Sequence, residues 1–130
     1  MGAVLHQVVD DAKQPLAFFS VKLSPAQQKY SAFDRELLAI FEAVRHFRFD
    51  LEGRPFVVHT DHKPLVHALD RKSPPWSARQ QSQLSYLSEF DITITHVPGK
   101  ENVVADLLSR PPNVLSIQLP PPPSPMIDYL

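Results

Sequence analysis

The chain has 130 residues, of which 43% are hydrophobic and 21% charged, as in an ordinary globular protein with one domain. It contains no cysteine, which excludes disulfides and thiolate zinc sites. We expect an intracellular protein, cytoplasmic or nuclear, with no membrane partner, because no apolar run has the length of a membrane span and no signal-peptide pattern is present. The net charge of −1 argues against binding nucleic acid by bulk electrostatics alone but leaves a local basic patch open.

The first half of the chain predicts a hairpin and one long helix. Two apolar runs, residues 3–9 and 16–23, flank the polar segment 10–15, which is typical of an antiparallel hairpin. Ser31 can then cap a helix whose apolar residues recur at helical spacing as far as Phe47.

The second half predicts shorter elements around two strands. The β-branched and aromatic run 56–60 predicts a strand buried on both faces, and the alternation in residues 91–97 predicts a half-buried strand. Short helices are expected at residues 64–69, 77–88 and 102–109. This order of elements predicts an α/β domain in which helices pack on a mixed sheet.

Proline dominates the end of the chain. Half of the 14 prolines lie in residues 111–130, and residues 120–123 are an unbroken proline run. Because proline interrupts helices and central strands, we expect a disordered tail or linker from Pro111 onward. The expected folded domain is therefore residues 1–110.

Three acidic residues occupy positions where an isolated surface charge is unusual. Glu36 lies at the edge of the helix's apolar stripe, Asp61 directly follows a predicted strand, and Asp106 lies among four apolar residues. Such half-buried carboxylates are costly without a positive partner, and magnesium is a partner that takes carboxylate, water and phosphate oxygens. Two such ions about 3.5–4 Å apart can activate a water and stabilise the leaving oxygen in phosphodiester cleavage.

An ordinary structural role is open for each of these carboxylates. Glu36 could pair with an arginine or lysine, and Asp61 could cap the short helix that follows it. Asp106 could pair with Arg110 at the i+4 position. Spacing alone does not choose between these roles and metal binding.

Three segments, taken in their order along the chain, resemble a known family. Residues 31–40 read SAFDRELLAI, residues 60–65 read TDHKPL, and residues 96–106 read HVPGKENVVAD. In that order and at those intervals they closely resemble the ribonuclease H (RNase H) domain of the reverse transcriptase of gypsy-type long-terminal-repeat retrotransposons. The resemblance spans roughly residues 2–110.

The resemblance implies a fold, an activity and a metal. Relatives have a mixed five-stranded sheet flanked by helices, and they cleave the RNA strand of an RNA–DNA hybrid with two magnesium ions held by four carboxylates. By motif, Glu36, Asp61 and Asp106 would be the second, third and fourth of these, with Mg²⁺ or Mn²⁺ as the cofactor. His96 falls where relatives place a residue that assists product release.

Substrate contacts and partners are implied as well. His62 and Lys63 belong to the family's Thr-Asp-His-Lys pattern, and Arg79 belongs to a basic region after the third strand. These side chains are candidates for contact with the hybrid. The basic residues are equally compatible with a face that only contacts solvent. The implied partners are the RNA–DNA hybrid and the polymerase and integrase regions of a parent polyprotein.

One departure from the family's pattern bears on activity. In relatives an aspartate on the first strand precedes the Gly-Ala-Val-Leu stretch and is expected to bridge both metals, whereas only Met1 precedes Gly2 here. We therefore expect a truncated first strand and impaired catalysis. The first hypothesis is therefore a metal-dependent endonuclease. The alternative is a non-catalytic remnant of the RNase H fold that acts as a nucleic-acid-binding or protein-interaction module.

Overall fold

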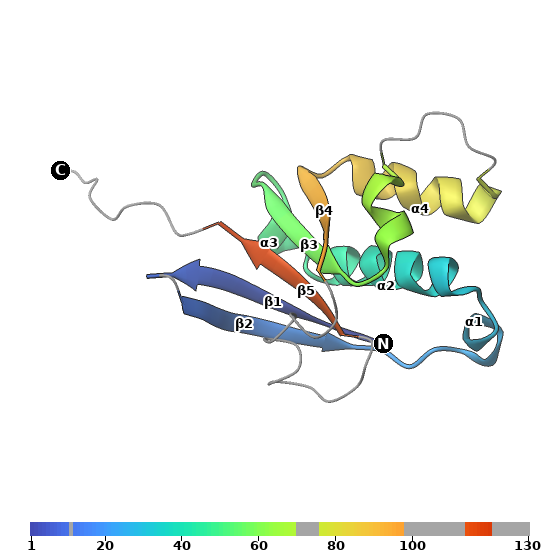
Figure 1. The fold of residues 1–130 in the computed structure, drawn as a ribbon, viewed down its shortest axis with the longest axis horizontal. Coiled ribbons are helices and arrows are strands. Elements are labelled where there is room, and N and C mark those ends of the chain that lie inside the picture. Colours follow the sequence, from blue (N-terminus) through green and yellow to red (C-terminus); the bar gives the residue numbers. More distant parts are fainter. Residues whose placement is uncertain (11, 70–75, 98–113, 121–130) are drawn as a thin grey trace.

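The computed structural model describes residues 1–10, 12–69, 76–97 and 114–120 (Figure 1). In chain order the elements are β1 (Gly2–Val9), β2 (Ala12–Ser20), α1 (Pro25–Gln28), α2 (Ala32–His46), α3 (Arg48–Leu51), β3 (Phe56–Thr60), the 3₁₀ helix η1 (Lys63–His67), α4 (Ala78–Ser88), β4 (Ile92–His96) and β5 (Val114–Leu119). The strands form one five-stranded sheet in the order β2-β1-β5-β3-β4, with parallel and antiparallel neighbours. This confirms the expected α/β domain with a mixed sheet and flanking helices.

The first two strands form the expected antiparallel hairpin, with a tighter turn than the sequence predicts. The ladder runs from the Gly2–Ser20 pair to the Val9–Ala12 pair, so much of the segment predicted as a turn belongs to β2. Asp10 takes a φ of 53° at the turn, a conformation that aspartate tolerates better than most residues.

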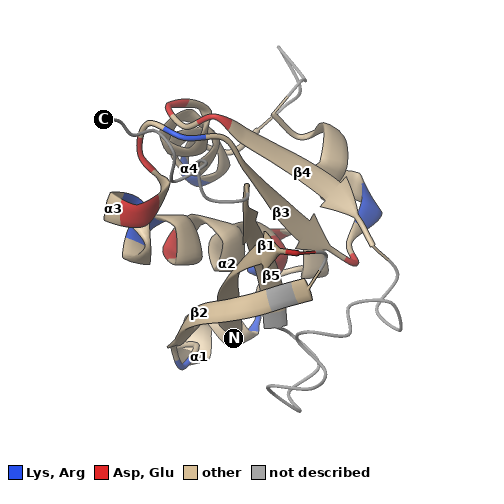
Figure 2. Cartoon of the chain, turned by 90° about the vertical axis from the view of Figure 1, so that its left-hand side faces the viewer, with Lys and Arg blue, Asp and Glu red and all other residues tan. Residues whose placement is uncertain are grey.

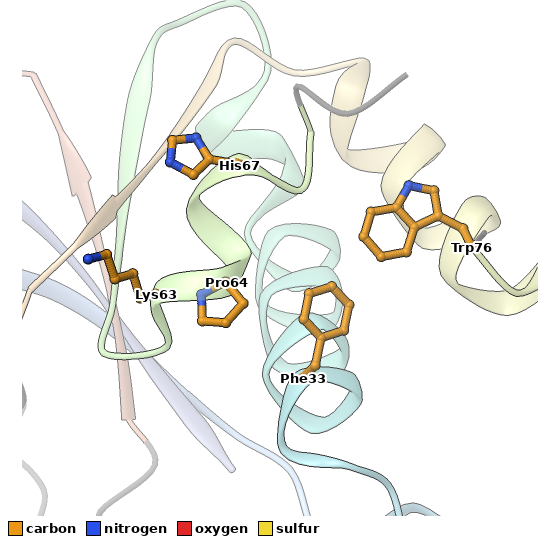
Figure 3. Close-up of a pocket in the computed structure, with 5 residues that line it drawn as sticks. All are labelled: Phe33, Lys63, Pro64, His67 and Trp76. Atoms are coloured by element: carbon orange, nitrogen blue, oxygen red, sulfur yellow. The ribbon is translucent and has the colours of Figure 1, made fainter. Parts of the chain in front are cut away.

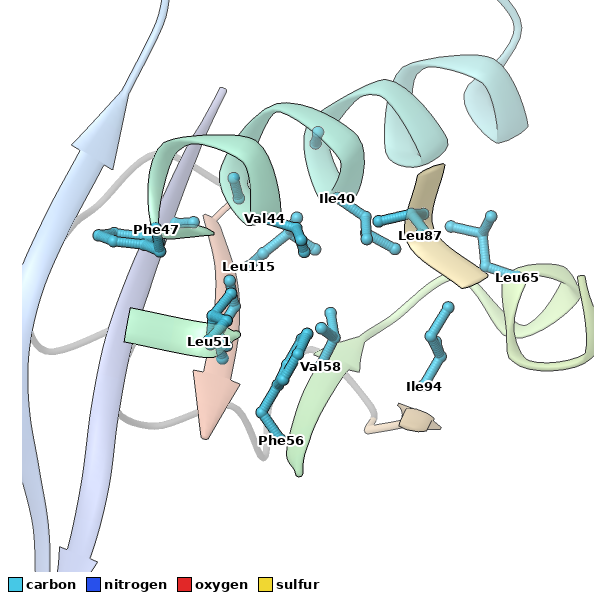
Figure 4. Close-up of a cluster of buried hydrophobic side chains, with 14 of the residues drawn as sticks. Ile40, Val44, Phe47, Leu51, Phe56, Val58, Leu65, Leu87, Ile94 and Leu115 are labelled. Atoms are coloured by element: carbon cyan, nitrogen blue, oxygen red, sulfur yellow. The ribbon is translucent and has the colours of Figure 1, made fainter. Parts of the chain in front are cut away.

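Helix α2 lies against the sheet and supplies much of the core. Its N-cap is the expected one, since the Ser31 side chain accepts a hydrogen bond from the Asp34 N–H at 3.2 Å. Its inner face buries Leu37, Ile40 and Val44 completely (Figure 4). The helical spacing of apolar residues therefore predicted both the helix and its buried face.

Strand β3 is buried on one face rather than on both. Phe56, Val58 and Thr60 are buried, whereas Val57 and His59 are only half-buried, so the prediction of burial on both faces was wrong. The apolar run does not distinguish the two cases, because a half-buried face also tolerates β-branched side chains. In the neighbouring parallel strand β4, Ile92 is half-buried and Ile94 buried while Thr93 and Thr95 are exposed, as the alternation predicts, but His96 is exposed as well.

The remaining predicted helices are found in part. The segment expected at 64–69 is the 3₁₀ helix η1, and α4 begins after Ser77, whose side chain forms a capping box with Gln80. The short helices α1 and α3 were not predicted, and the helix expected at 102–109 lies outside the described residues. Within the described part of the chain, no helix is long and apolar enough to cross a membrane.

The last strand contradicts the expectation of a disordered tail from Pro111 onward. β5 lies in the middle of the sheet between β1 and β3, and buries Leu115, Ile117 and Leu119. The prediction was wrong for residues 114–119 because the prolines on either side dominated the composition. The six residues between them contain no proline and carry alternating aliphatic side chains, as a buried strand requires.

Candidate active site

Glu36 and Asp61 lie together at one edge of the sheet. Glu36 projects from the first half of α2, and Asp61 directly follows β3, where the His62 N–H donates to Thr60 Oγ1 at 3.1 Å. Both carboxylates line one hollow of about 210 Å³, which Met1 and His62 also line. The structure thus brings together two of the three carboxylates singled out in the sequence, which lie 25 residues apart in the chain.

The two carboxylates interact electrostatically. Burial raises the pKa of Glu36, the nearby Asp61 carboxylate raises it further, and the Arg35 guanidinium partly opposes both effects. A cation held between the two carboxylates would remove this repulsion. The site therefore favours a positive ligand.

The oxygen donors suit Mg²⁺ or Mn²⁺ in an open rather than an enclosed site. Magnesium is usually held by one or two carboxylates, with water and phosphate oxygens completing its shell, and Glu36 and Asp61 provide such a pair. Among the described residues, no three histidine, cysteine, aspartate or glutamate side chains are arranged so that they could hold a metal ion together. The third predicted ligand, Asp106, lies outside the described residues.

The structural alternatives for these two carboxylates receive no support from their contacts. The ion pairs within the described ranges involve Glu42, Glu52 and Asp34, and none involves Glu36 or Asp61. The N-cap position of η1 is His62 rather than Asp61, and no side chain caps this helix. The role of both residues as metal ligands stays a prediction.

His96 lies at the same edge of the sheet as Asp61. It is the partner of Thr60 in the parallel ladder of β3 and β4, and the following Val97 N–H donates to the Thr60 carbonyl at 2.8 Å. Its side chain is exposed. The backbone of His96 thus lies next to that of Thr60, and the assistance of His96 to product release stays a prediction.

A second, apolar hollow adjoins the first. Phe33, Lys63, Pro64, His67 and Trp76 line about 610 Å³ of open space between η1, α2 and the start of α4 (Figure 3). Phe33 and Trp76 stack at 5.5 Å between ring centroids and 13° between ring planes. We call this group the aromatic hollow.

His62 connects the two hollows. Its side chain lines the carboxylate hollow, and its ring meets the Phe33 ring edge-on at 6.1 Å. Lys63, the next residue, is exposed on the rim of the aromatic hollow. Both residues therefore lie where the sequence pattern placed candidate substrate contacts.

Arg79 is held by protein contacts away from the two carboxylates. Its guanidinium lies 3.5 Å from Asp34 Oδ2 and 4.1 Å from the centre of the Tyr30 ring. The same Asp34 accepts a hydrogen bond from Gln80 Nε2 at 2.7 Å. Arg79 therefore joins α4 to the start of α2, and its role in substrate contact stays a prediction.

Two features of the site were missed in the sequence. The stack of Phe33 on Trp76 beside the site depends on the tertiary arrangement and has no signal in the sequence around either residue. Met1 and Arg35, which line the carboxylate hollow, carry no local signal. The sequence signal that could have pointed to this part of the site is the Thr-Asp-His-Lys pattern and the proline and aromatic residues that follow it.

In the view of Figure 2, the described residues show no single basic face. Figure 2 shows acidic and basic segments interspersed on the helices and loops, while strands β3 and β4 are almost entirely uncharged. The charge of the candidate site therefore comes from local groups, such as Lys63 and the carboxylate hollow, more than from the electrostatic field of the described residues as a whole.

Comparison with known proteins agrees with the fold. Residues 1–90 match the family described as the RNase H-like domain found in reverse transcriptase. The chain belongs to this family. The match covers the hairpin, α2, β3, η1 and α4, and so includes Glu36 and Asp61.

The curated relatives are transposon polyproteins. The chain is 40% identical over 113 residues to the Transposon Tf2-3 polyprotein, the Transposon Tf2-4 polyprotein and the Transposon Tf2-5 polyprotein of Schizosaccharomyces pombe. Each match covers 85% of this chain but only 8% of the relative. The expected origin in a retrotransposon reverse transcriptase is confirmed at this level.

Proposed function

We propose that this RNase H-like domain hydrolyses the RNA strand of RNA–DNA hybrids with Mg²⁺ or Mn²⁺. The observation that carries the proposal is the pairing of the half-buried Glu36 with the exposed Asp61 in one hollow, where the carboxylate of Asp61 raises the pKa of Glu36. Family membership supports the same chemistry, since the two residues lie in the segments that resemble the catalytic motifs.

In this proposal, metal binding, proton transfer and substrate positioning belong to different residues. Glu36 and Asp61, with Asp106, would hold the metal, which when bound activates a water and stabilises the leaving oxygen. His96 is exposed at the end of β4, paired with Thr60, and its imidazole would hold or release a proton as the product leaves. His62 and Lys63 orient the hybrid through its sugar–phosphate backbone, which positions a substrate without reading its sequence.

Turnover by these 130 residues alone is expected to be weak. Of the four carboxylates that the resemblance implies, the sequence supplies Glu36, Asp61 and Asp106, and β1 carries no acidic residue. A site with fewer carboxylates neutralises less of the metal charge and fixes the ions less firmly. In a longer polyprotein, the rate of cleavage at this site would also depend on the segments next to it.

Cleavage of an end-labelled RNA–DNA hybrid in Mg²⁺ and in Mn²⁺ tests this proposal. We expect slow, metal-dependent cleavage of the RNA strand that Asp61→Asn abolishes. Glu42→Gln is the matched control, because Glu42 lies on the same helix and pairs with Arg45 at 3.1 Å. Cleavage that persists in Asp61→Asn, or that proceeds in chelator, would refute the assignment.

The aromatic hollow favours a second function, hybrid binding without turnover. Stacked rings beside an exposed lysine are suited to sugars and bases next to a phosphate backbone. Because Trp76 is the one tryptophan of the chain, its fluorescence reports occupancy directly. Hybrid should quench it, and Lys63→Ala should weaken the titration; an unchanged spectrum at saturating hybrid would rule this surface out.

A further inference from the structure

The proline-rich segment that follows β5 is not part of the candidate active site. Residues 120–125 read PPPPSP, with four consecutive prolines and a fifth two residues later. A sequence of this kind favours the extended polyproline II conformation, which loses little entropy when it binds. We call residues 120–125 the proline segment; of these, Pro120 lies among the described residues.

The aromatic hollow has the composition of a surface that binds such segments. Proline-rich peptides in the polyproline II conformation dock on grooves that are lined by aromatic side chains. The hollow of about 610 Å³ is lined by the rings of Phe33, Pro64 and Trp76, and its surface is almost entirely apolar. Figure 3 shows these three rings together with the side chains of Lys63 and His67.

The rings of the aromatic hollow are held in place by their protein contacts. The Trp76 ring stacks on the Phe33 ring at 5.5 Å between centroids, and the His62 ring meets the Phe33 ring edge-on at 6.1 Å. Both stacked rings are half-buried, whereas Lys63 and Pro64 are exposed at the rim. A ligand would therefore not have to order the rings that it contacts, which lowers the entropic cost of binding.

Charge favours the same pairing. Lys63 and His67 line the hollow, and none of the described residues that line it is acidic. Residues 120–130 contain one acidic residue, Asp128, and no basic residue. An exposed ion pair between Asp128 and Lys63 would add a small contribution to the apolar contact.

The proline run of one copy cannot reach its own aromatic hollow. β5 ends beside the start of β3, where Gln118 pairs with Val57, and Gln7 Nε2 donates to the Pro120 carbonyl at 2.8 Å. The hollow lies at the opposite end of the sheet, because η1 follows the end of β3 (Figure 1). β5 is six residues long, about 20 Å. The three prolines after Pro120 extend at most about 11 Å, so they cannot return along β5.

We propose that the aromatic hollow binds the proline segment of a second copy of this chain. Two copies that exchange their segments reciprocally form a closed dimer, whereas copies that each dock on the next form an open chain. In both arrangements, one proline segment fills one hollow.

This docking would control the access of nucleic acid to the aromatic hollow. The proposed binding of hybrid uses the same rings, and one hollow cannot hold both ligands. The regulatory consequence therefore rests on the proposed binding of hybrid. The docking itself needs neither metal nor catalysis.

A peptide with the sequence of residues 120–130 tests the docking on the dilute full chain. Trp76 is the one tryptophan of the chain and the peptide has none, so its fluorescence reports the hollow. The control peptide carries Pro121→Ser, Pro122→Ser and Pro123→Ser. We expect a saturable shift of the Trp76 emission, with an affinity about tenfold weaker for the control peptide. No shift at about 1 mM of the native peptide would overturn the proposal.

Two variants that complement each other test the association between copies. Phe33→Leu removes a ring of the hollow and keeps the proline segment, whereas the same three proline-to-serine substitutions in the full chain, the triple variant, keep the hollow. In sedimentation equilibrium we expect the mass of the native chain to rise with concentration and each variant alone to stay monomeric. A mixture of the two variants should form a one-to-one complex. Phe49→Leu is the matched control and should associate normally, because its ring is 81% exposed on α3, away from the hollow.

Several results would contradict the docking. Association that the triple variant retains, or that Phe49→Leu loses, would place the interface elsewhere and overturn the proposal. A difference in Trp76 emission between the native chain and the triple variant that is the same at every concentration would mean docking within one copy, which contradicts the exchange. If circular dichroism shows that Phe33→Leu does not fold, the peptide titration and the triple variant decide.

Hybrid added to the peptide-loaded chain separates this inference from the proposed function. Displacement of the peptide by hybrid supports both. Binding of the peptide while hybrid leaves the Trp76 emission unchanged contradicts hybrid binding at the hollow and leaves the docking standing. A response of Trp76 to hybrid without any response to the peptide contradicts the docking and leaves hybrid binding standing.

Discussion

The carboxylate of Asp61 adds to the effect of burial in raising the pKa of Glu36. The two side chains come from α2 and from the end of β3, and they meet in a hollow where neither has an ion-pair partner among the described residues. Folding therefore brings two like charges together. Such an arrangement opposes stability unless a ligand compensates for it.

Glu36→Gln should therefore stabilise the metal-free protein at neutral pH. The folded-state pKa of Glu36 lies above its ordinary value of 4.5, so the native state retains a proton that the unfolded state has lost, and stability falls as pH rises through that window. The melting temperature of the variant should exceed that of the native sequence by a few degrees at pH 7, and the difference should vanish below pH 4.5. Thermal unfolding at several pH values measures this.

The exposed Glu89 at the end of α4 supplies the control for that experiment. Glu89→Gln should leave the melting temperature nearly unchanged across the pH range. A stabilisation by Glu36→Gln that does not depend on pH would show that the charge of Glu36 is not its source.

Ile117→Ala should destabilise the domain strongly. Ile117 is fully buried between Leu5 and Val58 in the middle of the sheet, and emptying such a position costs about 2–5 kcal/mol. Urea unfolding followed by circular dichroism gives the free energy of unfolding. Leu16→Ala on β2, where the side chain is 52% exposed, is the control and should cost little. Equal small costs for both would contradict the place of β5 in the core.

Asp34→Asn should loosen the junction between α2 and α4. Asp34 accepts from Gln80 at 2.7 Å and pairs with Arg79 at 3.5 Å, and it lies in the first turn of α2, where its charge suits the helix dipole. We expect a loss of about 1–2 kcal/mol in the free energy of unfolding. Asp50→Asn, exposed in the short α3, should change it by much less. A difference that 1 M salt does not reduce would argue against the ionic part of the explanation.

The sequence predicted the elements whose signals are local. Ser31 and the apolar spacing that follows it define α2, and the alternation of Ile92, Thr93 and Ile94 defines β4, because caps and periodicity act over a few residues. Asp61 was expected at a strand end for the same reason. Its association with Glu36 followed from the resemblance and not from any pattern within the chain.

The sequence did not predict β5 because its stability comes from distant residues. The six residues alternate as a strand does, but so short a run between prolines does not decide between a strand and a tail. Only the partners His6 and His59 on neighbouring strands show why Ser116 is buried and Gln118 half-buried. The aromatic hollow was missed similarly, since Phe33 and Trp76 are far apart in the chain. Contacts between residues that are far apart in the chain produce no periodic pattern in the sequence.

The central claim is that Glu36 and Asp61 hold a divalent cation, and direct titration with Mn²⁺ tests it most closely. Electron paramagnetic resonance of the free ion measures binding by the native sequence, by Glu36→Gln, by Asp61→Asn and by the control Glu42→Gln. The account predicts that each of the first two substitutions weakens Mn²⁺ binding at least tenfold, because each removes one of two paired oxygen donors, while the control binds normally. Equal affinity in all four proteins would contradict it.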